Sequence, residues 1–589
     1  MCRIVGFHDF TLVDNDIRDR VTKLKNIMKR GGPDDDGEFI DYENKIALGH
    51  RRLSIIDLSS AGHQPMLNNE QDLVLVFNGE IYNYIELKKD LIKFGYNFLT
   101  TSDTEVVLNA YKKWGNECFK YFNGMFAIVI YNKITQEFIF ARDHAGIKPL
   151  YIFNDTNKIY FSSELRALKL LPFTKSNKDW ETYFLLFGYM PEPLSTLENV
   201  SMFPKSNYAV YNIKNKKINY FEYFSFKHTS LILDKKIAQN EIKEKLIKSV
   251  TRHLISDAPI ALFLSGGIDS SLLTLLSSPI LNEKLTTLSI SFDEKLYSER
   301  KYQQLIIDKT NSQHINFNIT KNIFIENLFE FFHAIDQPTI DGINTFFISK
   351  LAKDNGFKVA LSGLGADELF GGYPSNDRVK FIELARFIPK FLLKYGIHSK
   401  NKNLSKISLL TNPNQINKYL FLRSISTISE VSSLLGVPKI DIENLLLNLN
   451  NLQINNELEG FKEISYLETN FYMQSQLLRD TDVMSMWNSL EVRVPFLDKD
   501  LMNLVYNINP LLHTNNIKPK FLLTDTFHEI LPKEIWDRKK MGFQFPIKEW
   551  IQEIDSMSEI VKYAKKKFQK NDYSWSQLWS IHILENYKN

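Results

Sequence analysis

The pattern of strands and helices changes near residue 241, and this change limits the fold more than any other feature. After it, short apolar strands alternate with helices, and these strands are PIALFLS (259–265), KLTTLSISF (284–292) and KVALSG (358–363). Strands and helices that alternate at this spacing predict a parallel, doubly wound sheet. From about residue 374 the chain is mostly helical. We therefore expect residues 241–589 to form an α/β domain with a doubly wound parallel sheet and a largely helical C-terminal part.

The first third of the chain has a different pattern, in which short apolar strands are separated by turns. The expected strands are KIALGHRRLSIID (45–57), LVLVFNGEI (73–81), MFAIVIYN (125–132), EFIFARD (137–143) and KIYFSSE (158–164). Two stretches, 85–95 and 103–115, have helical spacing, and Asp103 is the expected N-cap of the second. We expect a first domain over residues 1–205 and a linker, with an edge strand or two, over 206–240.

Length and composition exclude several classes of protein. A chain of 589 residues is too long for one core, and 72 Lys and Arg against 69 Asp and Glu leave a net charge of +3. Binding to nucleic acid would need a basic face instead of this near balance. The start MCRIVGFHDF lacks the apolar core of a secretory signal, and no later apolar run is long enough to span a bilayer. Two cysteines exclude a disulfide framework, so we expect a soluble, cytoplasmic protein without membrane insertion.

The loop that follows the first strand of the second domain reads LSGGIDSS (264–271) and opens a helix. Glycines let backbone N–H groups approach an anion, and the N-terminus of a helix adds partial positive charge. An ordinary helix cap would explain a bare Ser-Gly-Gly, and the lack of a lysine excludes the usual P-loop of NTPases. The whole octet closely resembles the pyrophosphate loop of ATP pyrophosphatases, which split ATP between its α and β phosphates.

A second loop, LSGLGADELFGGY (361–373), ends another strand of the same sheet, so both loops should border one crevice. A carboxylate beside a polyphosphate in that crevice suits Mg²⁺, which prefers oxygen ligands. Asp269 and Asp367 are therefore the metal candidates, although Asp367 and Glu368 alone are equally consistent with the start of a solvated helix. Lys520 precedes an apolar helix, and by its pattern alone it would be a solvated charge.

Cys2 directly follows the initiator methionine. Removal of Met1 would place its thiol beside its own α-amino group, whose pKa of about 8 lets it act as a base near neutrality. One residue would then supply both the nucleophile and the base. A cysteine at this position is weak evidence on its own, and Cys118, within a helix, is expected to have no role.

Three further stretches, HRRLSIID (50–57), FNGEIYN (77–83) and SDTEVV (102–107), resemble glutamine amidotransferase domains of the N-terminal nucleophile type. The resemblance implies an α/β/β/α sandwich in which Cys2, Asn78 and Gly79 are catalytic, the last two as an oxyanion hole. It also implies a glutamine-binding set, which comprises Arg52, Ile55, Asn78, Glu80 and Asp103. Taken singly, these residues have ordinary explanations, namely a surface charge for Arg52, a hairpin turn at Asn78–Gly79 and a helix cap at Asp103.

Nearly the whole chain resembles the glutamine-hydrolysing asparagine synthetases, through GHRRLSIID, AGHQPM, NGEIYN, SDTE, ARDHAGIKPLY, LSGGIDSS, LSGLGADELFGGY, LLRDTDVMSMWNSLEVRVPFLD and RKKMGFQFP. The family implies that one domain hydrolyses glutamine and that ammonia passes to the other, where ATP adenylates a carboxylate, most simply that of aspartate. The implied cofactors are ATP as co-substrate and Mg²⁺, and a homodimer is implied by the resemblance alone. The residues implied to bind ATP and pyrophosphate are Leu264, Ser265, Gly266, Gly267, Asp269, Ser270, Ser271, Ile290, Ser362, Gly363 and Lys520.

Several positions depart from the family pattern. Arg3 stands where the family has glycine, and Gly31, in GGPDDDG, stands where it has arginine. His144 and Ala145 replace an arginine and an aromatic residue or glycine. Leu364 stands where members that make asparagine often carry an acid, which is thought to take a proton from the attacking ammonia.

Leu364, together with Gln337 and the TIDGINT stretch (339–345), leaves the acceptor carboxylate open. The alternative is the same chemistry on another carboxylate, such as a uronic acid in surface polysaccharide assembly. A third hypothesis is a non-catalytic sensor that binds glutamine and nucleotide. Retention of the polar site residues argues against the sensor, because decayed enzymes usually lose such groups.

Overall fold

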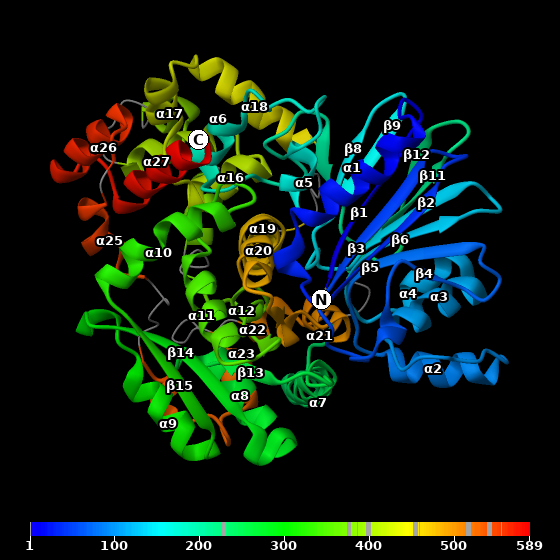
Figure 1. The fold of residues 1–589 in the computed structure, drawn as a ribbon. Coiled ribbons are helices and arrows are strands. Elements are labelled where there is room, and N and C mark those ends of the chain that lie inside the picture. The colour runs from blue at the N-terminus through cyan, green and yellow to red at the C-terminus, as the bar shows by residue number, and fades with distance from the viewer. Residues whose placement is uncertain are drawn as a thin grey trace.

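The chain forms two domains that lie side by side (Figure 1), in a computed structural model that describes residues 2–226, 231–373, 378–385, 387–395, 402–451, 458, 460–513, 520–538, 545–554 and 556–588. Met1 and residues 539–544, which belong to the RKKMGFQFP stretch, lie outside these ranges. None of the helices in the described ranges has both the length and the apolar composition that a membrane crossing requires.

The first domain is built on two antiparallel sheets of six strands each. The first sheet has the order β10 (Val200–Met202), β8 (Tyr151–Asn154), β9 (Lys158–Ser162), β1 (Cys2–Asp9), β3 (Ile46–Arg52) and β2 (Asp35–Asp41). The second has the order β12 (Lys217–Glu222), β11 (Asn207–Asn212), β7 (Glu137–Arg142), β6 (Gly124–Asn132), β5 (Leu73–Ile81) and β4 (Met66–Leu67). β11 and β12 lie within the stretch expected to be a linker, where they extend the second sheet from β7.

Apolar side chains of the two sheets face each other and form a buried layer, to which Ile4 and Leu48 contribute from one sheet and Val76 and Val129 from the other. Helix α1 (Asp14–Asn26) packs on the outer face of the first sheet. Helices α2 (Tyr84–Lys93) and α3 (Asp103–Trp114) pack on the outer face of the second. The expected α/β/β/α sandwich is thereby confirmed.

The cap of α3 differs from the prediction that Asp103 would fill this position. The N-cap is Ser102, whose hydroxyl accepts a hydrogen bond from the backbone N–H of Thr104. Asp103 is instead the first helical residue, and its carboxylate accepts a hydrogen bond from the N–H of Ile81 at 2.9 Å. Serine and aspartate cap helices about equally well, so the tertiary bond to Ile81 decides which of them does so.

The second domain contains the expected parallel sheet, in the order β15 (Gln313–Ile319), β14 (Thr286–Phe292), β13 (Ile260–Phe263), β16 (Val359–Leu361) and β17 (Glu491–Arg493). Helix α7 (Lys235–His253) precedes the first of these strands, and the helices between them include α8 (Ile268–Leu281), α9 (Arg300–Thr310), α10 (Lys321–Ala334) and α11 (Ile343–Asp354). Chain order reverses between β13 and β16, and ligands of such sheets bind where this reversal occurs.

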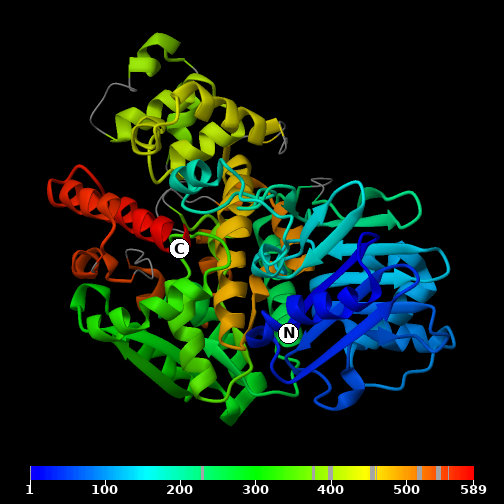
Figure 2. The ribbon, with the colours of Figure 1, turned by 45° about the horizontal axis from the view of Figure 1, so that its top comes forward.

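A long helical segment separates the two domains, and it runs through the middle of the molecule in Figure 2. It comprises α19 (Gly460–Leu467), a π-helical stretch over Glu468–Leu478 and α20 (Arg479–Trp487). The C-terminal part is largely helical as expected, and α16 (Gln415–Arg423), α17 (Ile428–Leu435) and α18 (Lys439–Asn451) belong to the lobe at the top of that view.

Asp143 organises a buried loop where the first domain meets the second. Its carboxylate accepts four backbone N–H bonds of 2.9–3.1 Å, from Phe126, Ala145, Ile147 and Lys148. The next residue, His144, directs Nε2 to the carbonyl of Leu497 at 2.7 Å. A carbonyl only accepts, so Nε2 carries the proton, and burial lowers the pKa of His144 to about 4. Neutral His144 and small Ala145 therefore fit a dry domain interface.

We predict that Asp143→Asn destabilises the fold by about 3 kcal/mol, because an amide has one acceptor oxygen and turns an NH₂ group toward N–H donors. The measurement is the free energy of unfolding in denaturant. The matched control is Asp155→Asn, at a more exposed turn where Asp155 accepts N–H bonds from Asn157 and Lys158. Equal small effects of the two substitutions would contradict the organising role of Asp143.

Candidate active site

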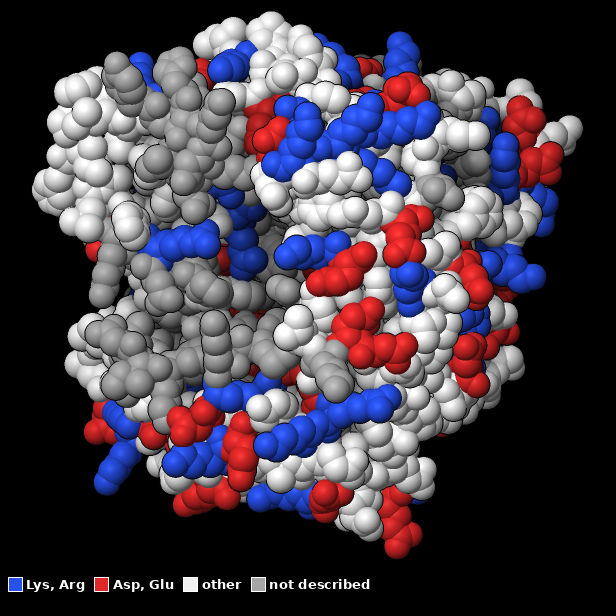
Figure 3. Space-filling model, turned by 90° about the vertical axis from the view of Figure 1, so that its left-hand side faces the viewer, with Lys and Arg blue, Asp and Glu red and all other residues white. Residues whose placement is uncertain are grey.

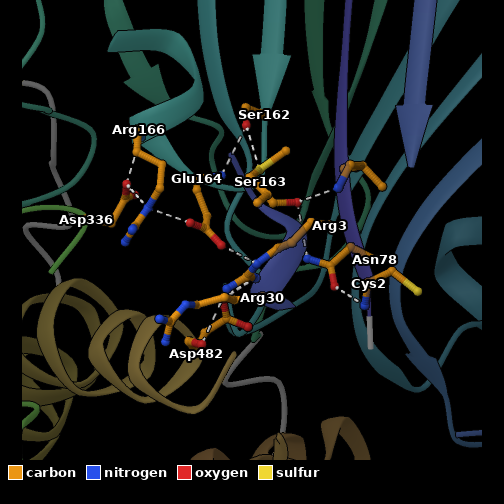
Figure 4. Close-up of polar contacts among 12 residues, drawn as sticks. Cys2, Arg3, Arg30, Asn78, Ser162, Ser163, Glu164, Arg166, Asp336 and Asp482 are labelled. Carbon is orange, nitrogen blue, oxygen red and sulfur yellow. Dashed lines mark hydrogen bonds and ion pairs between the residues drawn. The ribbon is translucent and has the colours of Figure 1, made fainter. Parts of the chain in front are cut away.

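Cys2, on a strand of the first sheet, and Asn78, on a strand of the second, lie against each other in the first domain (Figure 4). Cys2 begins β1 and is buried, and its backbone nitrogen donates a hydrogen bond to Oδ1 of Asn78 at 3.4 Å. The Asn78 amide Nδ2 donates to the hydroxyl of Ser163 at 3.4 Å. These two bonds fix which end of the amide faces the cysteine. Burial raises the pKa of the Cys2 thiol.

Gly79 follows Asn78 on β5 and cannot be replaced without a clash. Its φ is +150°, and an added Cβ would lie 2.0 Å from the carbonyl oxygen of Met125 on the neighbouring strand. The backbone therefore approaches β6 more closely here than any side chain would allow. This close approach sets the position of the predicted oxyanion donors.

Arg52 ends β3 directly opposite Cys2 in the strand pairing. Its guanidinium donates to the backbone carbonyls of Ser59, at 2.7 Å, and of Asp57. The chain turns away from the sheet after Arg52, which is why β3 is shorter than the predicted strand over 45–57. Ile55, in this turn, is buried in the apolar cluster shared with the second domain.

Two buried carboxyl groups, Glu80 and Asp103, complete the site of the first domain. Burial raises the pKa of both groups, that of Asp103 to about 6, and the nearby Glu491 carboxylate raises them further. Arg493 of the second domain lies 3.7 Å from Glu80 and also pairs with Glu491 at 2.5 Å. The first site is thus electrostatically linked to β17 of the second domain.

The second site is a cavity of about 800 Å³ at the carboxyl ends of the parallel strands. The predicted residues that line it are Leu264, Ser265, Gly267, Asp269, Ser270, Ile290, Ser362, Gly363, Asp367 and Lys520. Two predicted residues lie behind this wall. Ser271 is fully buried within α8, and Gly266, with a φ of +84°, accepts a hydrogen bond from Arg538 at its carbonyl.

Lys520 is the residue that joins the two loops of this cavity. Its ammonium lies 2.6 Å from an Asp269 carboxylate oxygen and 2.7 Å from Oδ1 of Asp367. Burial would lower the pKa of Lys520, but the two carboxylates outweigh burial and raise it. The backbone is close-packed around these groups, because a Cβ on Gly363 would lie 2.8 Å from that of Asp269, and one on Gly372 would lie 1.7 Å from Asp367 Oδ1.

The donor set around Lys520 fits a hard cation. Two carboxylates converge on one positive charge, and carboxylate oxygens are the ligands that Mg²⁺ prefers. Within the described residues, no group of three or more His, Cys, Asp or Glu side chains is arranged to hold a metal.

The cavity also has a carboxylate-rich portion that sequence reasoning did not assign. Asp341, Glu368 and Asp480 line it together with Leu364. Burial raises the pKa of Glu368 and of Asp480 to about 7 each. Glu368 accepts a hydrogen bond from the Tyr373 hydroxyl at 2.7 Å. Asp341 lies within the TIDGINT stretch and Asp480 within LLRDTD, so only their membership of unusual or family-like motifs could have indicated them.

The outer face beside the second domain carries acidic and basic side chains that are interspersed over most of its described surface (Figure 3). Sequence reasoning also missed Ser163, which accepts a hydrogen bond from Asn78, and Glu491 and Arg493 of β17, whose charges affect the pKa of Glu80.

Comparison with known proteins gives matches over both domains. Residues 1–224 match the family described as "Glutamine amidotransferase domain", and residues 241–577 match "Asparagine synthase". Glutamine-hydrolysing asparagine synthetase 1 of Bacillus subtilis is 32% identical, and the match covers 100% of this chain and 93% of that protein. Asparagine synthetase 3 of the same organism is 27% identical, and the match covers 96% of this chain and 91% of that protein. A putative asparagine synthetase 2 of Methanocaldococcus jannaschii is 35% identical, and the match covers 67% of this chain and 80% of that protein.

We predict that Gly372→Ala lowers the affinity for ATP with Mg²⁺ about tenfold or more, because the new methyl group would displace Asp367 and the Lys520 stem. Isothermal titration calorimetry with a non-hydrolysed ATP analogue measures this change. The control is Gly95→Ala, at a distant position with a φ of +88° and no atom within 4 Å of an added Cβ. Unchanged affinity in the Gly372 variant would contradict the role given to these groups.

Proposed function

Because the chain belongs to the asparagine synthase family and carries a glutamine amidotransferase domain, we propose that it makes asparagine from aspartate, ATP and glutamine. Members of this family use ATP. The observation that carries the proposal is the position of Lys520, held between Asp269 and Asp367 at the ends of adjacent parallel strands. A cation between two loops that expose backbone N–H groups suits the polyphosphate of a nucleotide.

In the first half-reaction, the thiol of Cys2 attacks the side-chain carbonyl of glutamine, and its own α-amino group, freed by loss of Met1, takes the proton. The side-chain amide of Asn78 and the N–H of Gly79 stabilise the developing oxyanion. The α-amino group then returns this proton to the departing nitrogen, so that ammonia leaves, and water releases glutamate from the thioester. Asp103 binds the α-ammonium group of glutamine, and Arg52 binds its carboxylate.

In the second half-reaction, the side-chain carboxylate of aspartate attacks the α-phosphorus of ATP, and pyrophosphate leaves. The loop over 264–271 and Lys520 hold the departing pyrophosphate. When bound, Mg²⁺ supplies positive charge to the phosphates, and Asp269 and Asp367 are the residues that would hold it. Ammonia then attacks the acyl-adenylate and displaces AMP, and the product is the amide.

The carboxylate-rich portion of the cavity favours aspartate over a uronic acid. Asp341, Glu368 and Asp480 lie there, and the α-ammonium group of aspartate can pair with them, whereas a uronic acid has no cationic group to do so. Leu364 has no group to take a proton from attacking ammonia. Glu368, on the same loop, is suited to that task because its pKa is about 7.

We also place the reaction in the cytoplasm, because the mechanism needs Cys2 as a free thiol. Both Cys2 and Cys118 are free and buried. A reducing compartment keeps such thiols reduced.

The test of this function follows AMP and asparagine. The intact protein should form both from aspartate, ATP and glutamine, and Cys2→Ala should lose glutamine-dependent synthesis while it keeps synthesis from added ammonia. Cys118→Ala, at the other buried cysteine, is the matched control and should keep both. AMP release with a uronic acid but not with aspartate would overturn the acceptor, and glutamine-dependent turnover by the Cys2 variant would overturn the nucleophile.

The pKa of Asp103 predicts how glutamine binding depends on pH. This pKa is raised to about 6, so the carboxylate is charged above that pH and becomes protonated as the pH falls through it. The KM for glutamine should therefore rise below about pH 6, since a neutral carboxyl group no longer pairs with the ammonium group. Asp103→Asn should remove this pH dependence, and Glu105→Gln, on the same helix, should keep it. A flat profile in the intact protein would contradict the assignment.

A further inference from the structure

Arg3 lies next to Cys2 on β1 but points the other way, toward α20 of the second domain (Figure 4). Successive side chains of a strand face opposite sides of the sheet, which explains the divergence. Arg3 is fully buried. Its Nε lies 2.6 Å from Oε1 of Glu164, and its Nη1 lies 2.6 Å from Oδ2 of Asp482. The strand that carries the nucleophile therefore has a charged contact with the second domain.

The contact with Asp482 leads to one wall of the synthetase cavity. Asp482 lies on α20, two residues after Asp480, which lines the cavity. Lys148 of the first domain also pairs with Asp482, at 2.9 Å. Burial would raise the pKa of Asp482, but the charges of Arg3 and Lys148 outweigh burial and keep it below its usual value. Asp482 is thus a charged link between the domains.

The contact with Glu164 leads to a second wall. Arg166 lies 2.7 Å from the other oxygen of Glu164, and the carboxylate of Asp336 accepts the backbone N–H groups of Leu165 and Arg166 at 2.7 Å each. Asp336 starts the segment whose later residues, Ile340, Asp341 and Gly342, line the cavity.

The two walls are themselves joined. The hydroxyl of Thr339 donates a hydrogen bond to Asp480, and a Cβ on Gly342 would lie 3.1 Å from the side chain of Met484 on α20. Short, buried contacts therefore connect both walls of the cavity with Arg3.

Gly31 shows that Arg3 occupies a space made for it. An added Cβ at Gly31 would lie 2.7 Å from Cγ and 2.8 Å from Nε of Arg3. The two departures from the family pattern, arginine at position 3 and glycine at position 31, are thus in direct contact. In this chain position 3 supplies the guanidinium, and position 31 leaves it room.

We propose that Arg3 is a positioning residue that couples the two half-reactions, because it fixes the strand of Cys2 to both walls of the synthetase cavity. This inference rests on the proposed function. When ATP fills the cavity, the walls shift Glu164 and Asp482, and Arg3 carries the shift to the strand on which Cys2 faces Asn78. Packed interfaces of this kind change between discrete arrangements, so small movements are passed on.

The substitution that tests the coupling is Arg3→Met. It removes the guanidinium but leaves every carboxylate with a cation, because Asp482 keeps Lys148 and Glu164 keeps Arg166. The matched control is Glu86→Gln, which removes another ion pair between the domains, that of Glu86 and Arg252 at 3.3 Å, outside this chain of contacts.

The measurement is the KM and kcat for glutamate release from glutamine, with and without ATP and Mg²⁺. In the intact protein, ATP with Mg²⁺ should change kcat/KM by about fivefold or more. Arg3→Met should bring this ratio of kcat/KM with and without ATP close to one, while Glu86→Gln keeps it. The proposal is overturned if the intact protein shows no such factor, or if Arg3→Met retains it.

A second substitution that restores the effect of ATP in an Arg3 variant distinguishes coupling from a merely structural role of Arg3. Arg3→Gly should lose the factor, and the double variant Arg3→Gly with Gly31→Arg should recover it, because an arginine at position 31 projects into the vacated space. A double variant that synthesises asparagine from ammonia but shows no recovery contradicts the role of the guanidinium. Glutamate release with ATP alone needs no acceptor, so this test gives a result even if aspartate proves to be the wrong substrate.

Discussion

Oppositely charged side chains are buried against each other where the two domains join, and the placement of one site relative to the other depends on that contact. Arg3 and Lys148 share the carboxylate of Asp482, and Arg493 lies between Glu80 and Glu491. Burying such groups is costly, and loss of one partner typically costs about 3–5 kcal/mol, whereas well-packed apolar residues can be equally stable. Stability alone therefore does not explain these pairs. Ion pairs have directions and distances, and they fix the register of two surfaces that apolar packing would leave free to slide.

The same physical argument applies within the second site. Asp269 and Asp367 come from different loops, and without a cation between them their charges would repel. Lys520 supplies that cation from a third segment, so three parts of the chain are placed by one ammonium group. The backbone must be open for this to occur, which is why Gly363 and Gly372 stand where any side chain would collide with an aspartate. The ion pairs of Lys520 can therefore form only if glycine occupies both of these positions.

Sequence reasoning succeeded where the signal is local. The octet at 264–271 combines an apolar strand, glycines and a helix start, and the structure lines one cavity with most of its residues. The polar strand β15 was missed because it pairs on one side only, with β14, so Gln313 and Asn316 are not required to be apolar. The three-residue β17 was missed because it is too short to show a period. The partners of Arg3 lie 161 and 479 residues away, a distance over which one sequence carries no pattern.

A departure from a family pattern can be interpreted only when the contacts of that residue in the folded protein are known. In the sequence, Arg3 and Gly31 are two unrelated departures from the family pattern near the nucleophile. In the fold they are in contact, and the Arg3 side chain occupies the space that a side chain at position 31 would need. Leu364 requires the same treatment. It lines the same cavity as Glu368, whose pKa burial raises to about 7, so the proton acceptor that we propose lies four residues further along the loop. The absence of an acid at position 364 therefore does not exclude the reaction, because burial can give a neighbouring carboxyl group the required pKa.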